Sequence, residues 1–262
     1  MKKPTKHQAL VSIITPLYNA EAYITHTIQS IQNQTYTHWE HIIVNDCSTD
    51  ASLEIVEEFA KKDTRIKVVT LSRNSGAAQS RNKATELATG DYIAFLDSDD
   101  LWHPEKLEKQ LRFMEEKGAA VSYTSYVHIN EKGEPLGKRI KALPELSYKK
   151  QHSNNYIGNL TGIYKASEIG KIIAPNIRKR QDWAVWLEAI KKSNRAAVGL
   201  QEDLAYYRIR QGSISSNKLN LVKYNFRFYK EYLGYSWIKS TFCLSRFFYE
   251  YFFVRTKWIE RN

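Results

Sequence analysis

Three carboxylates that stand close together are the side chains of this sequence best suited to chemistry. Asp97, Asp99 and Asp100 follow an apolar segment at residues 92–96, which is typical of a strand buried in a parallel sheet. Like charges at a strand end are costly unless a cation or several donors compensate them. Their oxygens suit Mg²⁺ or Mn²⁺, which often share a site with substrate phosphates. The alternative, an acidic cap on a helix at residues 102–117, explains Asp100 only. We therefore favour a metal site.

Alternating strands and helices must position these carboxylates. Short apolar segments predict strands at residues 11–15, 41–45, 66–71 and 92–96. The segments between them carry apolar residues at helical spacing; one predicted helix spans residues 21–32, with Asn19 as its N-cap. This order predicts an α/β fold in which right-handed βαβ units form a parallel sheet covered on both sides.

Polar residues stand at the ends of three predicted strands. They are Thr15, Asp46 and Asp97, and in open α/β sheets ligands bind beyond the carboxyl ends of strands. One nucleotide could contact all three ends. Tyr18 would then stack on its base, Asp46 would accept hydrogen bonds from the N–H edge of that base, and a metal at Asp99 would hold its diphosphate. Taken singly, Tyr18 also fits core packing and Asp46 a helix cap.

A basic segment with a glycine suits the phosphates of the same ligand. Arg81 lies in R-N-S-G-A-A-Q-S-R-N, where Gly76 permits a tight backbone and a helix N-terminus follows. The alternative for Arg81 is a solvated surface charge.

The composition indicates a folded protein with an anionic partner. The chain has 262 residues and a formal net charge of +11, which favours a nucleotide, a nucleic acid or an anionic membrane surface as partner. Cys47 and Cys243 lie far apart, without the spacing of a zinc site, and are expected to be reduced thiols. Residues 1–9 are polar and do not form a signal peptide, so we expect a cytoplasmic location.

Four motifs together resemble one enzyme family. V-S-I-I-T-P-L-Y-N, I-I-V-N-D-C-S-T-D, N-S-G-A-A-Q-S-R-N and F-L-D-S-D-D are similar to segments of the family 2 inverting glycosyltransferases with the GT-A fold, and the likeness continues more weakly to about Asn217. The resemblance implies a Rossmann-like mixed, mainly parallel sheet flanked by helices. It also implies a nucleotide sugar, most plausibly UDP-linked, and Mn²⁺ or Mg²⁺ as cofactor. Asn45 and Cys47 depart from the family pattern, in which many members have Asp and Gly.

The resemblance also assigns the donor site. Asp97 and Asp99 correspond to the metal-binding DxD motif, with Asp99 contacting the metal most directly. The segment Y-R-I-R-Q-G-S-I-S-S-N-K resembles the part of the family that closes over the donor diphosphate, and Arg210 replaces a histidine of many relatives. The residues expected to bind the donor nucleotide are Thr15, Pro16, Tyr18, Asn19, Glu21, Asp46, Arg81, Asp97, Arg210 and Ser213.

The same resemblance assigns the catalytic base to Asp182 in R-K-R-Q-D-W-A-V-W-L. An inverting transfer needs one carboxylate that takes the proton of the acceptor hydroxyl, and it needs no covalent intermediate. The alternative is that Asp182 only caps a helix at residues 183–192. The three basic neighbours at positions 178–180 either keep Asp182 ionised or attract an acidic acceptor, and the sequence does not choose between these roles.

We divide the chain into three parts. Residues 1–120 would form the nucleotide-sugar-binding half and residues 121–217 the acceptor-binding and catalytic half of one GT-A domain, with strands predicted at residues 121–129 and 155–164. Residues 218–262 are a helical tail rich in aromatic and basic residues. Charges interrupt every apolar run of this tail, so it cannot span a membrane. The tail suits the surface of an anionic leaflet, which would make the protein peripheral at the inner face of the plasma membrane. The alternative is that it packs on the domain or on a second subunit in a homo-oligomer.

The sequence therefore predicts a metal-dependent inverting glycosyltransferase. It would transfer a sugar to a hydroxyl of a glycan or lipid-linked glycan in the synthesis of a bacterial surface polysaccharide, and the likeness is nearest to enzymes of teichuronic acid, cell-wall or capsule synthesis. The alternative is a non-catalytic scaffold or sensor that binds a nucleotide sugar. A sugar-1-phosphate nucleotidyltransferase would need a glycine-rich loop where this chain has T-P-L-Y-N-A. No nucleic-acid motif is present, so nucleic acid is not expected as a partner.

Overall fold

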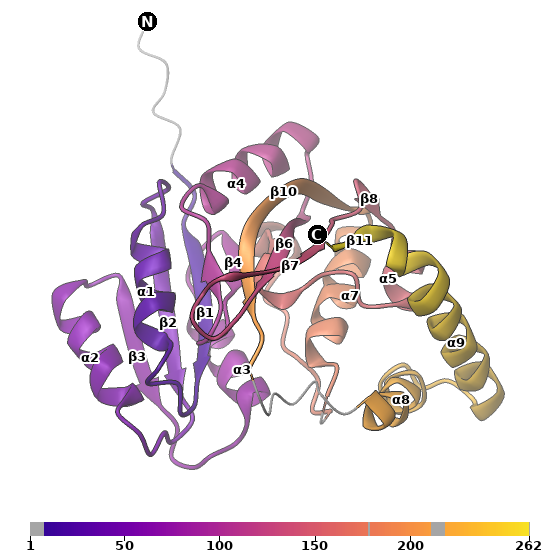
Figure 1. The fold of residues 1–262 in the computed structure, drawn as a ribbon, viewed down its shortest axis with the longest axis horizontal. Helices are drawn as coiled ribbons and strands as arrows, with labels where there is room; N and C mark the ends of the chain where they lie inside the picture. Colours follow the sequence, from indigo (N-terminus) through magenta and orange to yellow (C-terminus); the bar gives the residue numbers. More distant parts are fainter. Residues whose placement is uncertain (1–7, 178, 211–217, 262) are drawn as a thin grey trace, which may run out of the picture.

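Four parallel strands form the part of the sheet that carries the predicted donor site (Figure 1). The computed structural model describes residues 8–177, 179–210 and 218–261. The sheet order β4-β1-β2-β3 brings the carboxyl ends of β1, β2 and β4 to one edge, because all three run in the same direction. The four strands are β1 (Val11–Leu17), β2 (Trp39–Asn45), β3 (Ile66–Thr70) and β4 (Tyr92–Phe95).

Helices cover both faces of these strands, as the alternation of segments predicts. One core cluster lies under α1, α2 and α4, and a second lies under α3 and α7. On α1, the buried residues Ile24, Ile28 and Ile31 recur at helical spacing and form its apolar face. The bounds are α1 (Ile24–Gln32), α2 (Ser52–Lys62), α3 (Ala77–Leu87), α4 (Lys106–Lys117) and α7 (Gln181–Ser193).

The second half of the chain extends the sheet mainly with antiparallel strands. β9 joins β4 to β6, β7 and β11 follow at the edge, and β10 runs parallel to β6 and also pairs with β5 and β8. The mixed α/β sheet flanked by helices is therefore confirmed, and the parallel part lies mainly in the first half. The bounds are β5 (Leu101–Trp102), β6 (Val121–Ile129), β7 (Pro135–Ile140), β8 (Glu145–Leu146), β9 (Ile163–Tyr164), β10 (Ala197–Arg208) and β11 (Ile259–Arg261).

Several predicted boundaries were wrong where tertiary pairing overrides local pattern. β1 continues through Pro16 to Leu17, because its last residues still pair with β2. Asn19 is not the N-cap of α1: its backbone is left-handed, with φ of 45°, and Tyr23 holds the cap position. The helix predicted from residue 102 begins at Lys106, because β5 pairs with β10.

The strand predicted at residues 155–164 was also mostly wrong. A 3₁₀ turn (Asn159–Thr161) interrupts it, and only β9 pairs with the sheet. Two short helices flank this stretch, α5 (Tyr148–Ser153) and α6 (Ala166–Ile169).

The C-terminal segment is helical and then returns to the sheet. α8 (Lys218–Arg227) and α9 (Trp237–Tyr249) continue into π-helical turns (Phe228–Tyr232 and Glu250–Val254), and a 3₁₀ turn (Arg255–Trp258) leads into β11. A third core cluster joins this segment to α7, where Trp183 stacks on Phe228 with ring centroids 4.1 Å apart. Figure 1 shows α9 at the opposite end of the molecule from α2. No described helix combines the length and apolar character needed to cross a bilayer.

Candidate active site

The loop after β1 presents three of the predicted donor residues. Tyr18 is about half exposed, at 51%. The carbonyl oxygen of the Asn19 side chain accepts a hydrogen bond from the Thr49 amide at 2.8 Å, and Glu21 accepts one from the Ala51 amide at 2.9 Å. Asn19 and Glu21 therefore join the loops after β1 and β2, and Tyr18 remains open to a ligand.

Thr15 and Pro16 belong to the end of the strand that underlies the site. Both are buried in β1. The Thr15 hydroxyl donates to the Leu96 carbonyl at 2.7 Å and lies 2.8 Å from Nε2 of His41. The sequence places these residues among the donor contacts, but the Thr15 side chain is engaged within the sheet. Its position supports the strand end that precedes Asp97.

Asp46 fixes the backbone that starts α3. It is buried, and its two carboxylate oxygens accept hydrogen bonds from the amides of Ser75 and Gly76, each at 2.7 Å. Gly76 has a φ of 87°, which glycine adopts without the strain that a side chain would cause. Asp46 does not cap α2, whose N-cap position is held by Ala51. It thus joins the end of β2 to the helix that carries Arg81.

Each carboxylate of the D-S-D pair meets an arginine. Nη2 of Arg81 lies 2.6 Å from Asp97, and Nε of Arg210 lies 2.7 Å from Asp99. Burial and the charge of Asp97 raise the pKa of Asp99. Burial lowers the pKa of Arg81, but the carboxylates of Asp97, Asp182 and Asp99 together raise it above its usual value. These groups therefore form one electrostatic unit.

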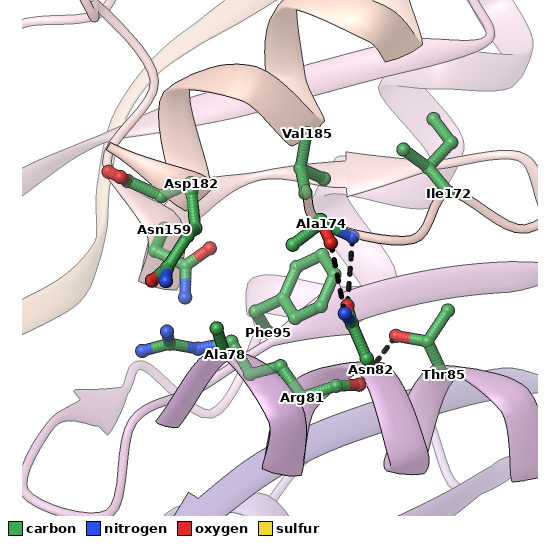
Figure 2. A pocket seen from close by; sticks show the side chains of 11 residues that line it. Ala78, Arg81, Asn82, Thr85, Phe95, Asn159, Ile172, Ala174, Asp182 and Val185 are labelled. Carbon is green, nitrogen blue, oxygen red and sulfur yellow. Dashed lines mark hydrogen bonds between the residues drawn. The ribbon is translucent and has the colours of Figure 1, made fainter. Parts of the chain in front are cut away.

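Asp182 faces this unit from the first turn of α7. Its Oδ2 accepts a hydrogen bond from Nδ2 of Asn155 at 2.8 Å. Asp182 does not cap its helix, because Arg180 holds that position. Figure 2 shows Arg81, Asn159 and Asp182 converging on one small cavity from α3, from the turn before β9 and from α7. Nδ2 of Asn159 also lies 3.5 Å from Asp97.

Two charged residues next to the site have structural roles. Asp100 is buried and accepts a hydrogen bond from the Arg208 amide at 2.9 Å, so it does not cap α4. The Arg208 guanidinium is buried and donates to the carbonyls of Asp99, Asn130 and Glu131, so it is not free to bind phosphate. Ser213 and Arg178 lie outside the described residues.

Two asparagines that sequence reasoning missed complete the site. Asn155 contacts Asp182 and Asn159 contacts Asp97, yet both fall in the segment predicted as a strand. The signal available in N-Y-I-G-N-L-T was polar residues around a glycine, which is a pattern of loops.

The described residues contain no group of three or more His, Cys, Asp or Glu side chains that could hold a metal. Asp97 and Asp99 are thus a pair of carboxylates, and a metal bound there would need further ligands from a substrate or from water. The raised pKa of Asp99, caused by burial and by Asp97, indicates a place where an added cation would be stabilised.

The fold, together with the charged residues at the carboxyl edge of β1, β2 and β4, defines a glycosyltransferase of the GT-A class. The structure of residues 1–349 of Staphylococcus aureus TarS, solved in complex with UDP-GlcNAc, matches with a TM-score of 0.72 and 27% identity over 94% of this chain and 74% of that one. A mannosyltransferase from Pyrobaculum calidifontis, solved with GDP-Man and Mn²⁺, shares the fold, with a TM-score of 0.67 at 15% identity.

The family follows from the sequence comparison. The model of glycosyl transferase family 2 matches residues 12–170, and the chain belongs to this family. It is 47% identical to Bacillus subtilis TuaG, provisionally named a teichuronic acid biosynthesis glycosyltransferase, over 93% of this chain and 96% of that one. It is 39% identical to Escherichia coli WfgD, a UDP-Glc:α-D-GlcNAc-diphosphoundecaprenol β-1,3-glucosyltransferase, over 82% and 83% of the two chains.

Proposed function

We propose that this glycosyltransferase transfers a sugar, with inversion, from a UDP-sugar to a hydroxyl of a glycan or lipid-linked glycan in bacterial surface polysaccharide synthesis. The observation that carries the proposal is the convergence of Asp182, Arg81 and the Asp97–Asp99 pair at one edge of the sheet. The relatives TuaG, WfgD and TarS support the substrate class by their printed names. Residues 1–120 would hold the donor, residues 121–217 the acceptor, and residues 218–262 a helical extension.

The donor nucleoside would occupy the loops after β1 and β2. The exposed Tyr18 ring provides a surface on which a base can stack. A carboxylate has about four lone-pair sites, so Asp46 can accept a base N–H and keep its two amide hydrogen bonds. Arg210 would leave Asp99 for the donor diphosphate, because a doubly charged phosphate group offers it a stronger partner.

The Asp97–Asp99 pair fits a divalent cation. Two carboxylates with substrate phosphates and water are the ligand set that Mg²⁺ and Mn²⁺ accept. Asp99, and with it Asp97, would hold the ion. When bound, the ion would neutralise the charge that develops on the departing UDP. Departure of Arg210 from Asp99 would free a carboxylate oxygen for this role.

Asp182 would act as the catalytic base. It would take the proton of the acceptor hydroxyl while that oxygen attacks the anomeric carbon and the bond from this carbon to the UDP oxygen breaks. A single displacement of this kind inverts the anomeric configuration. The Asn155 amide holds the Asp182 carboxylate in place, and Arg81 lies opposite, where it stabilises the diphosphate side.

We also propose that α9 places the enzyme on an anionic membrane surface, at the inner face of the plasma membrane. Apolar side chains stand along the outer face of α9 and of the π-helical turn that follows it, and they are largely exposed: Ile238 (85%), Phe242 (68%), Tyr249 (60%) and Phe253 (65%). Residues 218–262 also carry nine Lys and Arg against three Asp and Glu. An amphipathic helix with this charge suits an anionic interface.

The membrane proposal is tested by sedimentation with phosphatidylglycerol vesicles. The double variant Ile238→Ser, Phe242→Ser should lose most of its vesicle binding, and Leu87→Ser, which changes an exposed apolar residue of α3, should keep it. Equal binding by all three proteins would reject the proposal. Size-exclusion chromatography of the same proteins tests the alternative: if the wild type is a dimer and the double variant a monomer with unchanged vesicle binding, α9 is a subunit contact.

The catalytic proposal is tested first by calorimetric titration with UDP, UDP-glucose, UDP-GlcNAc, GDP and GDP-mannose, each with and without Mn²⁺. We expect UDP and at least one UDP-sugar to bind tightly only when Mn²⁺ is present. Failure of every nucleotide to bind would overturn the proposal. If the wild type binds a UDP-sugar tightly but neither transfers the sugar nor slowly hydrolyses the donor, a sensor is favoured instead.

A further inference from the structure

Four strands place a row of side chains on one face of the sheet beside the proposed acceptor half. Tyr207 of β10 pairs in register with His128 of β6, and Arg261 of β11 pairs with Lys138 of β7. The β6–β7 ladder is irregular between Val127 and Ile129, but Lys138 lies two residues before Ile140, which opposes Tyr126, and the Tyr126 ring stacks on His128. Because side chains alternate between faces, all four members of the row point to the same side.

Two of these residues repel each other. Arg261 stands directly opposite Lys138, and like charges in this position destabilise a sheet. Arg255, from the 3₁₀ turn before β11, adds a third cation. Burial lowers the pKa of Lys138, and so do the charges of Arg261 and Arg255. Lys138, Arg255 and Arg261 therefore form a cationic cluster.

The acidic side chains nearby are already engaged elsewhere. Glu260 and Asp203 pair with Arg139 on the opposite face of the sheet, and Glu260 also contacts Lys141. Glu250, five residues before Arg255, contacts Lys150 and the Tyr156 hydroxyl. Within the part of the chain that the structure describes, the cationic cluster forms no ion pair with an acidic side chain. Its charge is thus available to an anion from outside.

The cationic cluster lies next to the proposed base. Nη1 of Arg255 donates to the Asn154 side chain at 2.6 Å and to the backbone carbonyl of Asn155. Asn155 in turn donates to Asp182. Asn155 alone therefore connects Arg255 of the cationic cluster to Asp182, the proposed base.

Aromatic rings flank the same surface. Tyr126 stacks on His128 with centroids 5.8 Å apart, and Tyr207 lies 5.4 Å from His128. Tyr126 and Tyr207 are only partly buried, and aromatic rings of this kind can pack against a sugar. The exposed outer face of α9 precedes Arg255 in the same helical segment, so an acyl or prenyl chain could leave this surface toward a bilayer.

We propose that the cationic cluster binds the diphosphate of a lipid-linked acceptor, an inference that rests on the proposed function above. A diphosphate carries the charge that three close cations require, and charge-assisted hydrogen bonds to phosphate are among the strongest in proteins. The acceptor sugar would then lie over the aromatic rings, with its hydroxyl directed to Asp182. The donor diphosphate and the acceptor diphosphate occupy separate sites on the two sides of the base.

Calorimetry can test this assignment with the full chain. The protein is saturated with UDP and Mn²⁺, so that the donor site is filled, and is titrated with geranyl diphosphate at matched Mn²⁺. Lys138→Gln and Arg261→Gln should each weaken geranyl diphosphate binding about tenfold. Lys141→Gln is the matched control: it removes the same charge beside the same strand, on a residue paired with Glu260, and should bind as the wild type does.

The outcomes separate this inference from the function on which it rests. If UDP itself does not bind, the proposed function fails. If UDP binds normally and all four proteins bind geranyl diphosphate equally, the cationic cluster is not an acceptor site. A second arm measures phosphatidylglycerol vesicle binding of the same proteins. Weaker vesicle binding in Lys138→Gln and Arg261→Gln, with unchanged geranyl diphosphate affinity, would assign the anion to bilayer headgroups and overturn the proposal.

Discussion

The two charged regions beside Asp182 differ in how their charges are compensated. On the donor side, Asp97 and Asp99 each meet an arginine at 2.6 and 2.7 Å. On the acceptor side, the three members of the cationic cluster meet no described acidic side chain. The charged groups of the donor side are thus held in ion pairs, whereas the cations of the acceptor side lack an acidic partner among the described residues and Arg255 is held by neutral groups of Asn154 and Asn155.

This difference indicates two ways of holding a diphosphate. In the proposed function, Arg81 and Arg210 would exchange carboxylate for phosphate when the donor binds, because Asp97 and Asp99 would then hold the cation. The acceptor site needs no exchange, because its cations repel one another until an anion arrives. Donor binding should therefore depend on a divalent cation, and acceptor binding should depend mainly on charge.

The largest effect is expected at the residue between the two regions. Asp182→Asn keeps the shape of the side chain but removes the base, so the rate of transfer should fall by at least about a thousandfold. UDP affinity should stay within about twofold, because Asp182 does not contact the nucleotide in this proposal. Steady-state kinetics and calorimetry on the same preparation check both statements. Wild-type activity in Asp182→Asn would refute the assignment of the base.

A smaller effect is expected on the donor side. Asp99→Ala removes the carboxylate that pairs with Arg210, and Mn²⁺-dependent UDP affinity should fall about a hundredfold. Affinity for geranyl diphosphate, measured at a UDP concentration high enough to fill the donor site of the variant as well, should not change, which would separate the two regions. Measurement of UDP binding over a Mn²⁺ series tests this prediction. An Asp99→Ala protein whose UDP affinity still rises with Mn²⁺ as in the wild type would contradict it.

The next prediction uses the two asparagines that the fold brings to the two carboxylates. Asn155→Ala removes the hydrogen bond to Asp182, so kcat should fall about tenfold with the donor KM unchanged. Asn159→Ala removes the longer contact to Asp97, so it should change the donor KM more than kcat. Initial rates over a matrix of donor concentrations give both constants. If both variants change kcat and the donor KM in the same way, the segment that holds Asn155 and Asn159 acts only as a structural support.

The donor side could be predicted from sequence because its geometry is a consequence of parallel strands. Residues that end β1, β2 and β4 reach one edge whatever the length of the loops between them. Thus Asp97 and Asp46 were placed correctly relative to each other by strand order alone. The pairing of each carboxylate with an arginine was not visible, because Arg210 approaches Asp99 from 111 positions away in the chain.

The acceptor side was hidden because it depends on contacts between distant segments. β11 has three residues and follows an aromatic helical segment, and nothing local indicates that it pairs with β7. The strand predicted at residues 155–164 is instead a loop fixed by Arg255 through Asn154 and Asn155. Sequence periodicity reports local structure, so it misses a loop whose conformation is set by a residue 100 positions later.

The smallest predicted effect concerns the support beneath the donor side. His41 is buried beside Thr15, and burial lowers its pKa to about 3, although the charge of Asp63 acts in the opposite direction. Because the unfolded chain takes up this proton near pH 6.5 and the folded chain does not, the free energy of unfolding should fall as the pH falls from about 6.5 toward 3. From pH 6.5 to 5.5 we expect a loss of about 1 kcal/mol. His41→Gln should remove this contribution to the pH slope, which urea unfolding at several pH values measures. If the variant does not fold, nuclear magnetic resonance of the wild type decides: a His41 ring that titrates above pH 6 would contradict the prediction.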